Sequence, residues 1–422
     1  MQILYQQCPI KMIKLLISRA KQISKEQIED EEELRGNIRK RSFFNYMSKH
    51  LKIAMFFSSD PRRPDGLLHH LYFLSEELRK LGHKVFLFGP NKQPKLPFRN
   101  YIKFGKLIEL NIGEETTFNI VFKSNNNQNP AETIEKKEKF DLIHFHDPYI
   151  PFVSLEVLKK TKLPVVATFH TAWDSESGFN FFNSIIPLFQ ETFNKVKAVI
   201  FVSKIGKLRW GNLFPKKIIR KVIPNGIDRN LYHPINLKNS KRITILFVAR
   251  IVRRKGLLYL LEAIKNLTKK FKDLKLIVLG DGPQLLACKQ YAKKNHLEKY
   301  VDFKGYITGK AKIRFYQEAD IFCAPYVNEA FGITILEAMA CGIPIVGFNS
   351  DGISEILKNY PDQDLIVPRK NIKLLEKSIY SLINDNEKRN IMKKWLLNKS
   401  KEFDWKMIAK ETEDLYYKVL KI

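Results

Sequence analysis

The chain has 422 residues, of which 44% are hydrophobic, and its 73 Lys and Arg against 44 Asp and Glu give a formal net charge of +29. This length suits two α/β domains rather than one, and the hydrophobic content excludes a globally disordered chain. The positive charge favours anionic partners, such as nucleotide phosphates, nucleic acid or an anionic membrane face, although an AT-rich genome would also enrich lysine.

The composition argues against several classes of protein. No run of eighteen apolar residues occurs, which excludes a transmembrane helix, and the first residues lack the apolar region and cleavage site of a signal peptide. The four cysteines contain no C-x-x-C pair, which argues against a disulfide framework and a zinc site. These features predict a cytoplasmic protein.

Residues 1–46 are interpreted as an N-terminal extension. Apolar residues recur at helical spacing from Ile10 to Ile23 with Lys and Arg between them, which is typical of a basic amphipathic helix lying on a membrane. The alternative is that Met47 is the true start, because the sequence leads from there directly into an apolar strand. The pattern is compatible with both.

Residues 47–225 predict a first doubly wound domain in which short apolar runs alternate with amphipathic segments. Strands are predicted at 51–57, 83–90, 140–147, 163–171 and 196–203. Helices are predicted at 67–82 and 154–162, and the stretch 91–139 is less regular. Buried strands separated by helices imply a parallel sheet covered on both faces.

A second doubly wound domain is predicted over 226–403, where a linker rich in Pro, Asn and Gly gives way to the same alternation. Strands are predicted at 243–250, 274–283, 301–306, 320–326 and 343–348, and helices at 256–271, 285–295, 311–319 and 332–342. A helix over 404–422 closes the chain and is expected to pack back toward the first domain. Two such domains facing each other across a cleft would share a ligand site at the carboxyl ends of their strands.

The segment NEAFGITILEAMACGIPIVG carries two glutamates eight positions apart. Glu329 is predicted on a loop at the carboxyl end of a strand, and Glu337 inside the following helix, about 12 Å away along its axis. The first N–H groups of that helix, from Phe331 onward, suit a phosphate, and Gly332 lets the backbone approach closely. One acid for each end of a sugar nucleotide is the functional interpretation, and an ordinary helix with two solvated glutamates is the alternative.

This Glu-x7-Glu pattern, on the second of two Rossmann-like domains, resembles glycosyltransferase family 4, whose members are retaining enzymes of the GT-B fold. The resemblance covers nearly all of residues 51–420. Four further segments are similar to family motifs: RRPDGLLHH at 62–70, TFHT at 168–171, VIPNGIDRNLYHP at 222–234 and VARIVRRKG at 248–256. The implied fold class is α/β, a GT-B fold of two Rossmann-like doubly wound domains facing across a cleft.

The resemblance also implies a set of site residues. The expected catalytic residues are His170 and Glu329. The expected donor-binding residues are Gly66, Arg250, Lys255, Ile307, Phe331, Gly332, Ile333 and Glu337, and the expected acceptor-binding residues are Asp65, His146 and Thr171. Since two fixed cations can stabilise a leaving diphosphate, no metal or other cofactor is expected beyond the nucleotide-sugar co-substrate.

Two other patterns could suggest a metal and are interpreted otherwise. The DQD run at 362–364 is predicted to be a loop, because Pro and Asp favour turns. His144 and His146 share one face of a strand, but no third ligand lies nearby in the sequence. His146 is instead expected to line the cleft.

Within family 4, the segments at 147–171 and 319–340 resemble the phosphatidylinositol mannosyltransferases. Three departures from that group concern ligand recognition. Asp65-Gly66 stands where a Gly-Gly pair is usual, Ser175 stands where a lysine is thought to meet the acceptor phosphate, and Gly309 replaces an acid that could recognise guanine. These departures leave other acceptors besides inositol phospholipid, and other nucleotide carriers besides GDP, as alternatives.

The function expected from these features is a retaining glycosyltransferase that moves a hexose, first of all mannose from GDP-mannose, to a phospholipid or glycolipid at the inner face of the plasma membrane. The alternatives are a UDP-sugar enzyme acting on diacylglycerol and an enzyme with a soluble or polysaccharide-pathway acceptor. From other classes, a basic nucleic-acid-binding protein lacks the expected basic ribbon, zinc fingers or helix-turn-helix, and a non-catalytic scaffold would not need its acidic and basic site residues intact. The expected partners are a nucleotide sugar, a lipid acceptor and an anionic membrane surface, without nucleic acid.

Overall fold

The computed structural model describes residues 49–62, 65–112, 116–122, 139–147, 153–170, 193–235 and 242–422. The predicted N-terminal extension and the positions Thr171 and Ser175 lie outside these ranges. None of the helices within them is long and apolar enough to span a bilayer.

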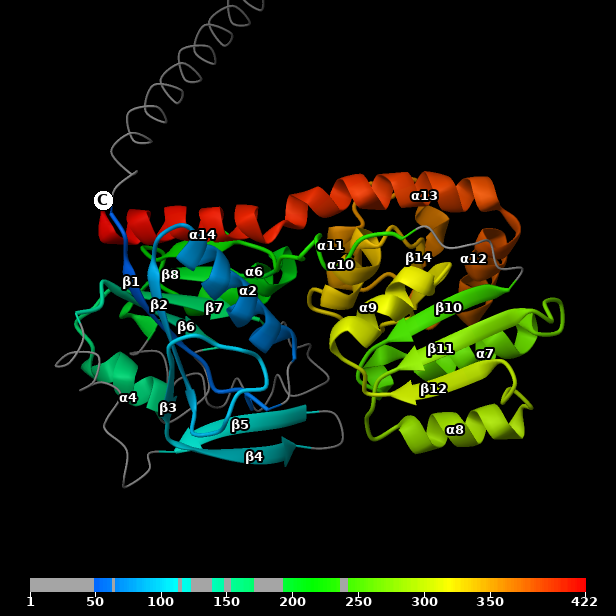
Figure 1. Ribbon diagram of the computed structural model, residues 1–422, viewed down its shortest axis with the longest axis horizontal. Helices are drawn as coiled ribbons and strands as arrows, with labels where there is room; N and C mark the ends of the chain where they lie inside the picture. Colours follow the sequence, from blue (N-terminus) through cyan, green and yellow to red (C-terminus); the bar gives the residue numbers. More distant parts are fainter. Residues whose placement is uncertain are drawn as a thin grey trace, which may run out of the picture. The chain divides into compact units, whose positions relative to one another are not determined.

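The first domain is built on a parallel seven-stranded sheet (Figure 1). Its strands are β1 Lys52–Phe56, β2 Lys84–Pro90, β3 Tyr101–Phe104, β6 Leu142–His146, β7 Val165–Phe169, β8 Val196–Phe201 and β9 Ile219–Val222, in the spatial order β3-β2-β1-β6-β7-β8-β9. Every residue of β6 and β7 is buried, as expected for strands of a sheet that is covered on both faces.

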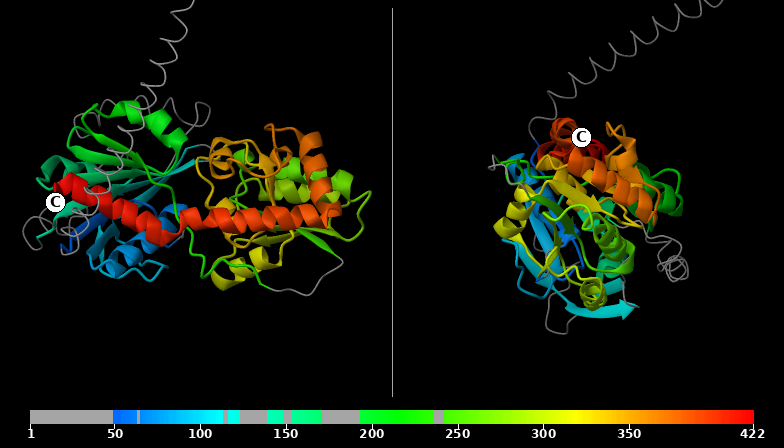
Figure 2. Two further views of the ribbon diagram at one scale, coloured as in Figure 1. Left: turned by 90° about the horizontal axis from the view of Figure 1, so that it is seen from above. Right: turned by 90° about the vertical axis from the view of Figure 1, so that its right-hand side faces the viewer.

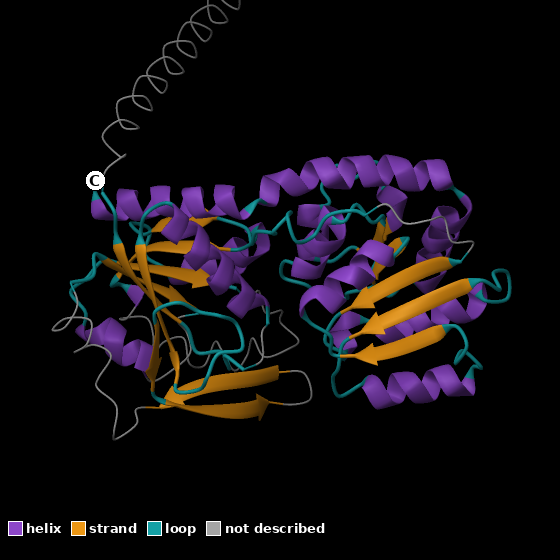
Figure 3. Ribbon diagram, viewed as in Figure 1, coloured by secondary structure: helices purple, strands orange, loops and turns teal. Residues whose placement is uncertain are grey.

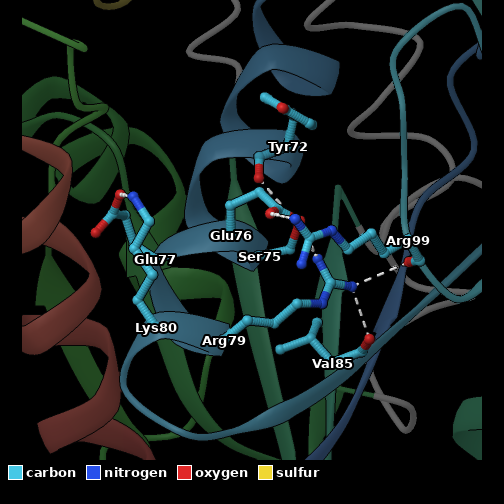
Figure 4. Close-up of polar contacts among 8 residues, drawn as sticks. All are labelled: Tyr72, Ser75, Glu76, Glu77, Arg79, Lys80, Val85 and Arg99. Carbon is cyan, nitrogen blue, oxygen red and sulfur yellow. Dashed lines mark hydrogen bonds and ion pairs between the residues drawn. The ribbon is translucent and has the colours of Figure 1, made fainter. Parts of the chain in front are cut away.

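The helical segments described in this domain are α2 Gly66–Lys80, α4 Val153–Lys160, α6 Lys204–Trp210 and the short 3-10 helix η2 Gly211–Leu213. The helix α2 starts at a cap in which Asp65 accepts a hydrogen bond from the backbone of Leu68, and its leucines enter the core. At its other end Arg79 donates to the carbonyl oxygens of Val85 and Arg99 (Figure 4). These bonds fasten the end of α2 to β2 and to the segment before β3.

A β-hairpin interrupts the alternation after β3. It consists of β4 Lys106–Ile112 and β5 Thr116–Phe122, which pair antiparallel as a separate sheet. Neither this hairpin nor β3 was predicted, since residues 91–139 were interpreted as irregular. The period-2 alternation of Ile108, Leu110 and Ile112 was the available signal.

The second domain is built on a parallel sheet, drawn in orange in Figure 3. It has six strands in the order β12-β11-β10-β13-β14-β15. Its strands are β10 Ile243–Val248, β11 Leu274–Leu279, β12 Val301–Gly305, β13 Ile321–Ala324, β14 Ile345–Phe348 and β15 Ile366–Val367. Its helical segments are η3 Arg253–Lys255, α7 Leu257–Leu267, α8 Leu285–Lys294, α9 Gly309–Glu318, α10 Ile333–Ala340, α11 Asp351–Ile356, η4 Gln363–Leu365, α12 Ile372–Asn384, α13 Asn386–Lys399 and η5 Ser400–Phe403. The expected pair of parallel-sheet α/β domains is confirmed.

The last helix, α14 Trp405–Leu420, continues from α13 through η5 (Figure 2). Its apolar face shares a buried core with β1 and α2 of the first domain, through side chains that include Trp405 and Ile408. Two buried polar contacts add to this packing. Nε2 of His83 lies 2.9 Å from Glu413, and Nδ1 of His144 lies 2.7 Å from the hydroxyl of Tyr416.

Candidate functional site

Several of the predicted site residues lie where the strand order of each sheet reverses. In the second sheet, β10 and β13 are neighbours, and the loops that follow them carry Arg250, Lys255 and Glu329. In the first sheet, β1 and β6 are neighbours, and His146 and Asp147 stand at the end of β6. The carboxyl edge at such a reversal is the usual ligand site of an open parallel sheet.

The loop after β10 is fastened to the loop after β13. Gly256 ends η3 with φ at +71°, and a Cβ at this position would lie 2.0 Å from the carbonyl oxygen of Pro325. Only glycine fits a backbone that is this close and left-handed. The amide of Val327 donates to the carbonyl of Arg254 at 2.8 Å, so the two loops hold their side chains in a fixed relation.

Lys255 and Glu329 form an ion pair between these two loops, with about an eighth of each side chain exposed. The ammonium of Lys255 also lies 4.4 Å from the centre of the Tyr326 ring. Burial opposes the charge on Glu329, but the attraction of Lys255 and Arg254 outweighs it and holds the pKa of this carboxyl below its usual value. Lys255, which was predicted to bind the donor diphosphate, and Glu329, which was predicted to bind the sugar, are thus paired with each other in this structure.

The helix α10 begins at Ile333, one residue later than predicted, after Gly332 at φ +93°. Since the first N–H groups of a helix have no partner within it, this end can receive an anion. Of the side chains predicted here as donor contacts, Phe331 is buried, and Ile333 and Ile307 are half-buried against the core of the second domain. The backbone of Phe331 and Ile333 at the start of α10 is therefore the part of these residues that the predicted donor contact would use.

Glu337 receives three side-chain donors. Its Oε1 accepts from the hydroxyl of Tyr232 at 2.8 Å and from Nζ of Lys312 at 2.6 Å, and its Oε2 accepts from the hydroxyl of Tyr316 at 2.7 Å. Burial, and then the charge of Glu337, raise the pKa of Tyr232 and Tyr316, so both remain donors. None of these three residues was predicted. Tyr232 stands inside the quoted linker motif, which was the one signal the sequence offered.

Because of this network, replacement of Glu337 and replacement of Glu329 are expected to change nucleotide affinity by different amounts. Glu337→Ala is expected to weaken the binding of a free nucleoside diphosphate by about 1.5–3 kcal/mol, because a nucleotide ribose would lose its charged acceptor while Tyr316 loses its own. Calorimetry on the purified protein measures this change. Glu298→Ala, at an exposed glutamate, is the control. A larger loss of nucleotide affinity in Glu329→Ala than in Glu337→Ala would reverse the predicted roles.

In the first domain, His170 follows β7 and stands beside His146. Nε2 of His170 lies 3.0 Å from Nδ1 of His146, and the backbone N–H of His170 donates to Asp147 at 2.8 Å. Burial, reinforced by the neighbouring histidines, holds the pKa of His170 and His146 well below the usual value. Both rings are therefore neutral near pH 7, which suits hydrogen bonding rather than a fixed positive charge.

A third histidine, His70 on α2, completes this group although it was not predicted. Its ring centre lies 4.6 Å from that of His170 and 5.4 Å from that of His146. Its Nδ1 lies 2.8 Å from Oδ1 of Asn225, and burial lowers its pKa to about 4. The expectation that His146 has no third ligand near it was wrong, because helix α2 and the loop after β7 bring two further histidines.

The glycine loop after β1 places the last two predicted residues of the first domain. Asp65 caps α2 through its side chain, so its observed role is structural, while Gly66 is the first residue of that helix. A Cβ on Gly66 would lie 2.9 Å from Cδ1 of Ile333. The start of α2 therefore approaches the start of α10, and a glycine keeps the approach open.

In the second domain Arg250 is exposed just after the end of β10.

Two doubly wound parallel sheets, with charged and polar side chains at their strand-order reversals, have the architecture of the GT-B fold and place a ligand site at those reversals. Comparison with known proteins agrees. The family model for glycosyltransferase family 4 matches residues 64–231, and the model for glycosyl transferases group 1 matches residues 228–395. The chain belongs to these glycosyltransferases and is an enzyme that transfers a sugar.

Three similar proteins show the extent of the likeness. A phosphatidylinositol N-acetylglucosaminyltransferase component of Arabidopsis thaliana is 27% identical, over 84% of this chain and 79% of that protein. The phosphatidyl-myo-inositol mannosyltransferase of Mycolicibacterium smegmatis is 26% identical, over 84% of this chain and 90% of that protein. The structure of sucrose-phosphate synthase from Thermosynechococcus elongatus matches with a TM-score of 0.69 at 20% identity, over 88% of this chain and all of that one. The predicted family and GT-B fold are confirmed.

Proposed function

We propose that this glycosyltransferase moves a hexose from a nucleotide sugar to a membrane lipid with retention of the anomeric configuration. The observation that carries the proposal is the Lys255–Glu329 pair beside the start of α10, which sets a cation, an acid and the first N–H groups of a helix at one strand-order reversal. A nucleotide sugar has the complementary groups in sequence: a diphosphate for the cation and the N–H groups, and sugar hydroxyls for the acid.

In this mechanism the bond between the anomeric carbon and the diphosphate oxygen breaks, and the acceptor oxygen bonds to the same face of the sugar. Arg250, Lys255 and the first N–H groups of α10 stabilise the charge that grows on the leaving diphosphate. Glu329 holds sugar hydroxyls, and neutral His170 donates or accepts a hydrogen bond at the sugar as positive charge develops on the ring. The departing diphosphate takes the proton of the acceptor, so no metal and no separate base are required.

The first candidate reaction transfers mannose from GDP-mannose to a phospholipid or glycolipid. It is supported by two relatives whose names specify phosphatidylinositol, one as a mannosyltransferase and one as an N-acetylglucosaminyltransferase. The formal charge of +29 supports catalysis at an anionic membrane surface, which we place at the inner face of the plasma membrane. A UDP-sugar transferred to diacylglycerol is the second candidate, because Gly309 and Asp65-Gly66 depart from the mannosyltransferase pattern.

A donor panel tests the proposal. The full chain is incubated with GDP-mannose, UDP-glucose, UDP-galactose and UDP-N-acetylglucosamine, with vesicles that contain phosphatidylinositol, with vesicles of diacylglycerol in neutral lipid, or without lipid. We expect one donor to be consumed fastest with anionic vesicles, and vesicle binding to weaken as salt rises, since surface attraction is screened over about 10 Å at 0.1 M salt. Equal donor consumption with and without lipid would contradict a lipid acceptor, and vesicle binding that ignores salt would contradict the anionic surface.

A further inference from the structure

Three imidazole rings from separate elements meet in the first domain. His70 lies on α2, His146 ends β6 and His170 follows β7. Each ring offers a nitrogen atom, and these three atoms all lie within 4.8 Å of one another. His70 and His146 are buried, at 3% and 2% exposure, and His170 is half-buried.

The hydrogen bonds of this group leave lone pairs unused. Oδ1 of Asn225 can only accept, so Nδ1 of His70 carries its proton and Nε2 of this neutral ring presents a bare lone pair. Nε2 of His70 finds no hydrogen-bond partner among the described residues, and neither does Nε2 of His146. Buried nitrogens without a partner are rare in folded proteins, and a bare imidazole nitrogen is a metal ligand.

The spacing and the surroundings of the rings also fit a metal ion. Two nitrogens bound to one tetrahedral Zn²⁺ lie about 3.3 Å apart, from Zn–N bonds of about 2.0–2.1 Å. Nδ1 of His146 and Nε2 of His170 lie 3.0 Å apart as a hydrogen-bonded pair, so a metal ion bound by both would replace the proton between them. Asn225 accepts from the ring Nδ1 of His70, which is the supporting bond that a histidine ligand usually has, and Asp147 accepts the backbone N–H of His170 and fixes the chain there.

We propose that His70, His146 and His170 form a Zn²⁺ site with three protein ligands and an open fourth position. Imidazole ligands without thiolate or carboxylate suit zinc among the common divalent ions. Metal binding draws Nε2 of His170 away from the sugar, so Zn²⁺ acts as a reversible inhibitor of transfer. The binding itself does not depend on the proposed function, whereas the inhibition rests on the role proposed for His170.

Calorimetric titration of the chelator-treated full chain with Zn²⁺ tests the site. We expect one ion per chain and an affinity at least about 100-fold weaker in His146→Gln. Loss of a group that only supports a ligand costs up to about 100-fold in metal affinity, and loss of a ligand itself should cost no less. His296→Gln, which removes an exposed histidine in the second domain, is the matched control and should bind as the wild type does. Co²⁺ as a probe should give the strong visible absorption of a four-coordinate ion in the wild type and lose it in His146→Gln.

Absence of stoichiometric binding, or equal binding in His146→Gln and wild type, would overturn the site. If His146→Gln does not fold by circular dichroism, His170→Ala at the half-buried position takes its place with the same expected loss. Transfer assays with added Zn²⁺ then separate the two proposals. Stoichiometric binding without inhibition would keep the metal site and contradict the placement of His170 at the reacting sugar.

Discussion

Replacement of His170 by alanine is expected to lower turnover by about 100-fold or more, a typical loss for one preorganised hydrogen bond at a developing charge. The affinity for a free nucleoside diphosphate should change by no more than about twofold, since an interaction made only in the transition state leaves binding unaffected. The structural reason is position. His170 stands at the carboxyl end of β7 in the first sheet, while the groups proposed to bind the diphosphate follow β10 and β13 in the second. Turnover and nucleotide affinity measured on the same preparation check both parts.

The matched control for this variant is His296→Ala, which removes an exposed imidazole. His170→Gln adds a further test, because a glutamine retains one hydrogen-bonding group and should recover part of the turnover. Near-normal turnover in His170→Ala would assign His170 to the buried histidine group as a structural residue. It would also remove the first domain's main contribution to the proposed mechanism.

The fold was predictable where one strand or helix carries its own pattern. The run VVATF of β7 is almost entirely apolar, which is the signature of a parallel sheet covered on both faces, whereas the equally buried β6 carries His144 and His146 within LIHFH. The hairpin β4–β5 was missed because its alternation is short and lies in a polar stretch. Helix starts were predictable to within one residue at α10, where Gly332 marks the left-handed position before Ile333.

Within the site, only the residues that belong to a recognised sequence motif were predictable. Glu329 and His170 follow strands as expected, and Lys255 lies in η3 after β10, because each motif itself positions its residue. Their partners come from distant sequence, and a single sequence carries no signal for such pairs: His70 and Asn225 are 155 positions apart, and Glu337 and Tyr232 are 105 apart. The tertiary fold decides these contacts, so residues that act on the predicted groups appear only in the structure.

Replacement of Lys255 by methionine is expected to weaken nucleoside diphosphate binding by about 30–100-fold, which corresponds to the roughly 2–3 kcal/mol of a charge-assisted contact with phosphate. Methionine keeps the length and apolar stem of the side chain and removes only the charge. The loss should be small for a nucleoside monophosphate, because Lys255 is assigned to the diphosphate end of the donor. Calorimetry with the two nucleotides separates this charge from general damage to the site. Equal losses for both nucleotides would contradict the assignment.

The partner variant Glu329→Gln should behave in the opposite way toward the free nucleotide. In the structure Glu329 holds the ammonium of Lys255, so a diphosphate must compete with this carboxylate for the same cation. Glutamine removes the competitor, and the affinity for the diphosphate should stay equal or rise. Turnover should nevertheless fall by about 100–1,000-fold, since the acid proposed to orient the sugar is lost. A Glu329→Gln variant that binds nucleotide more weakly than wild type would show that this carboxylate assists diphosphate binding instead of competing with it.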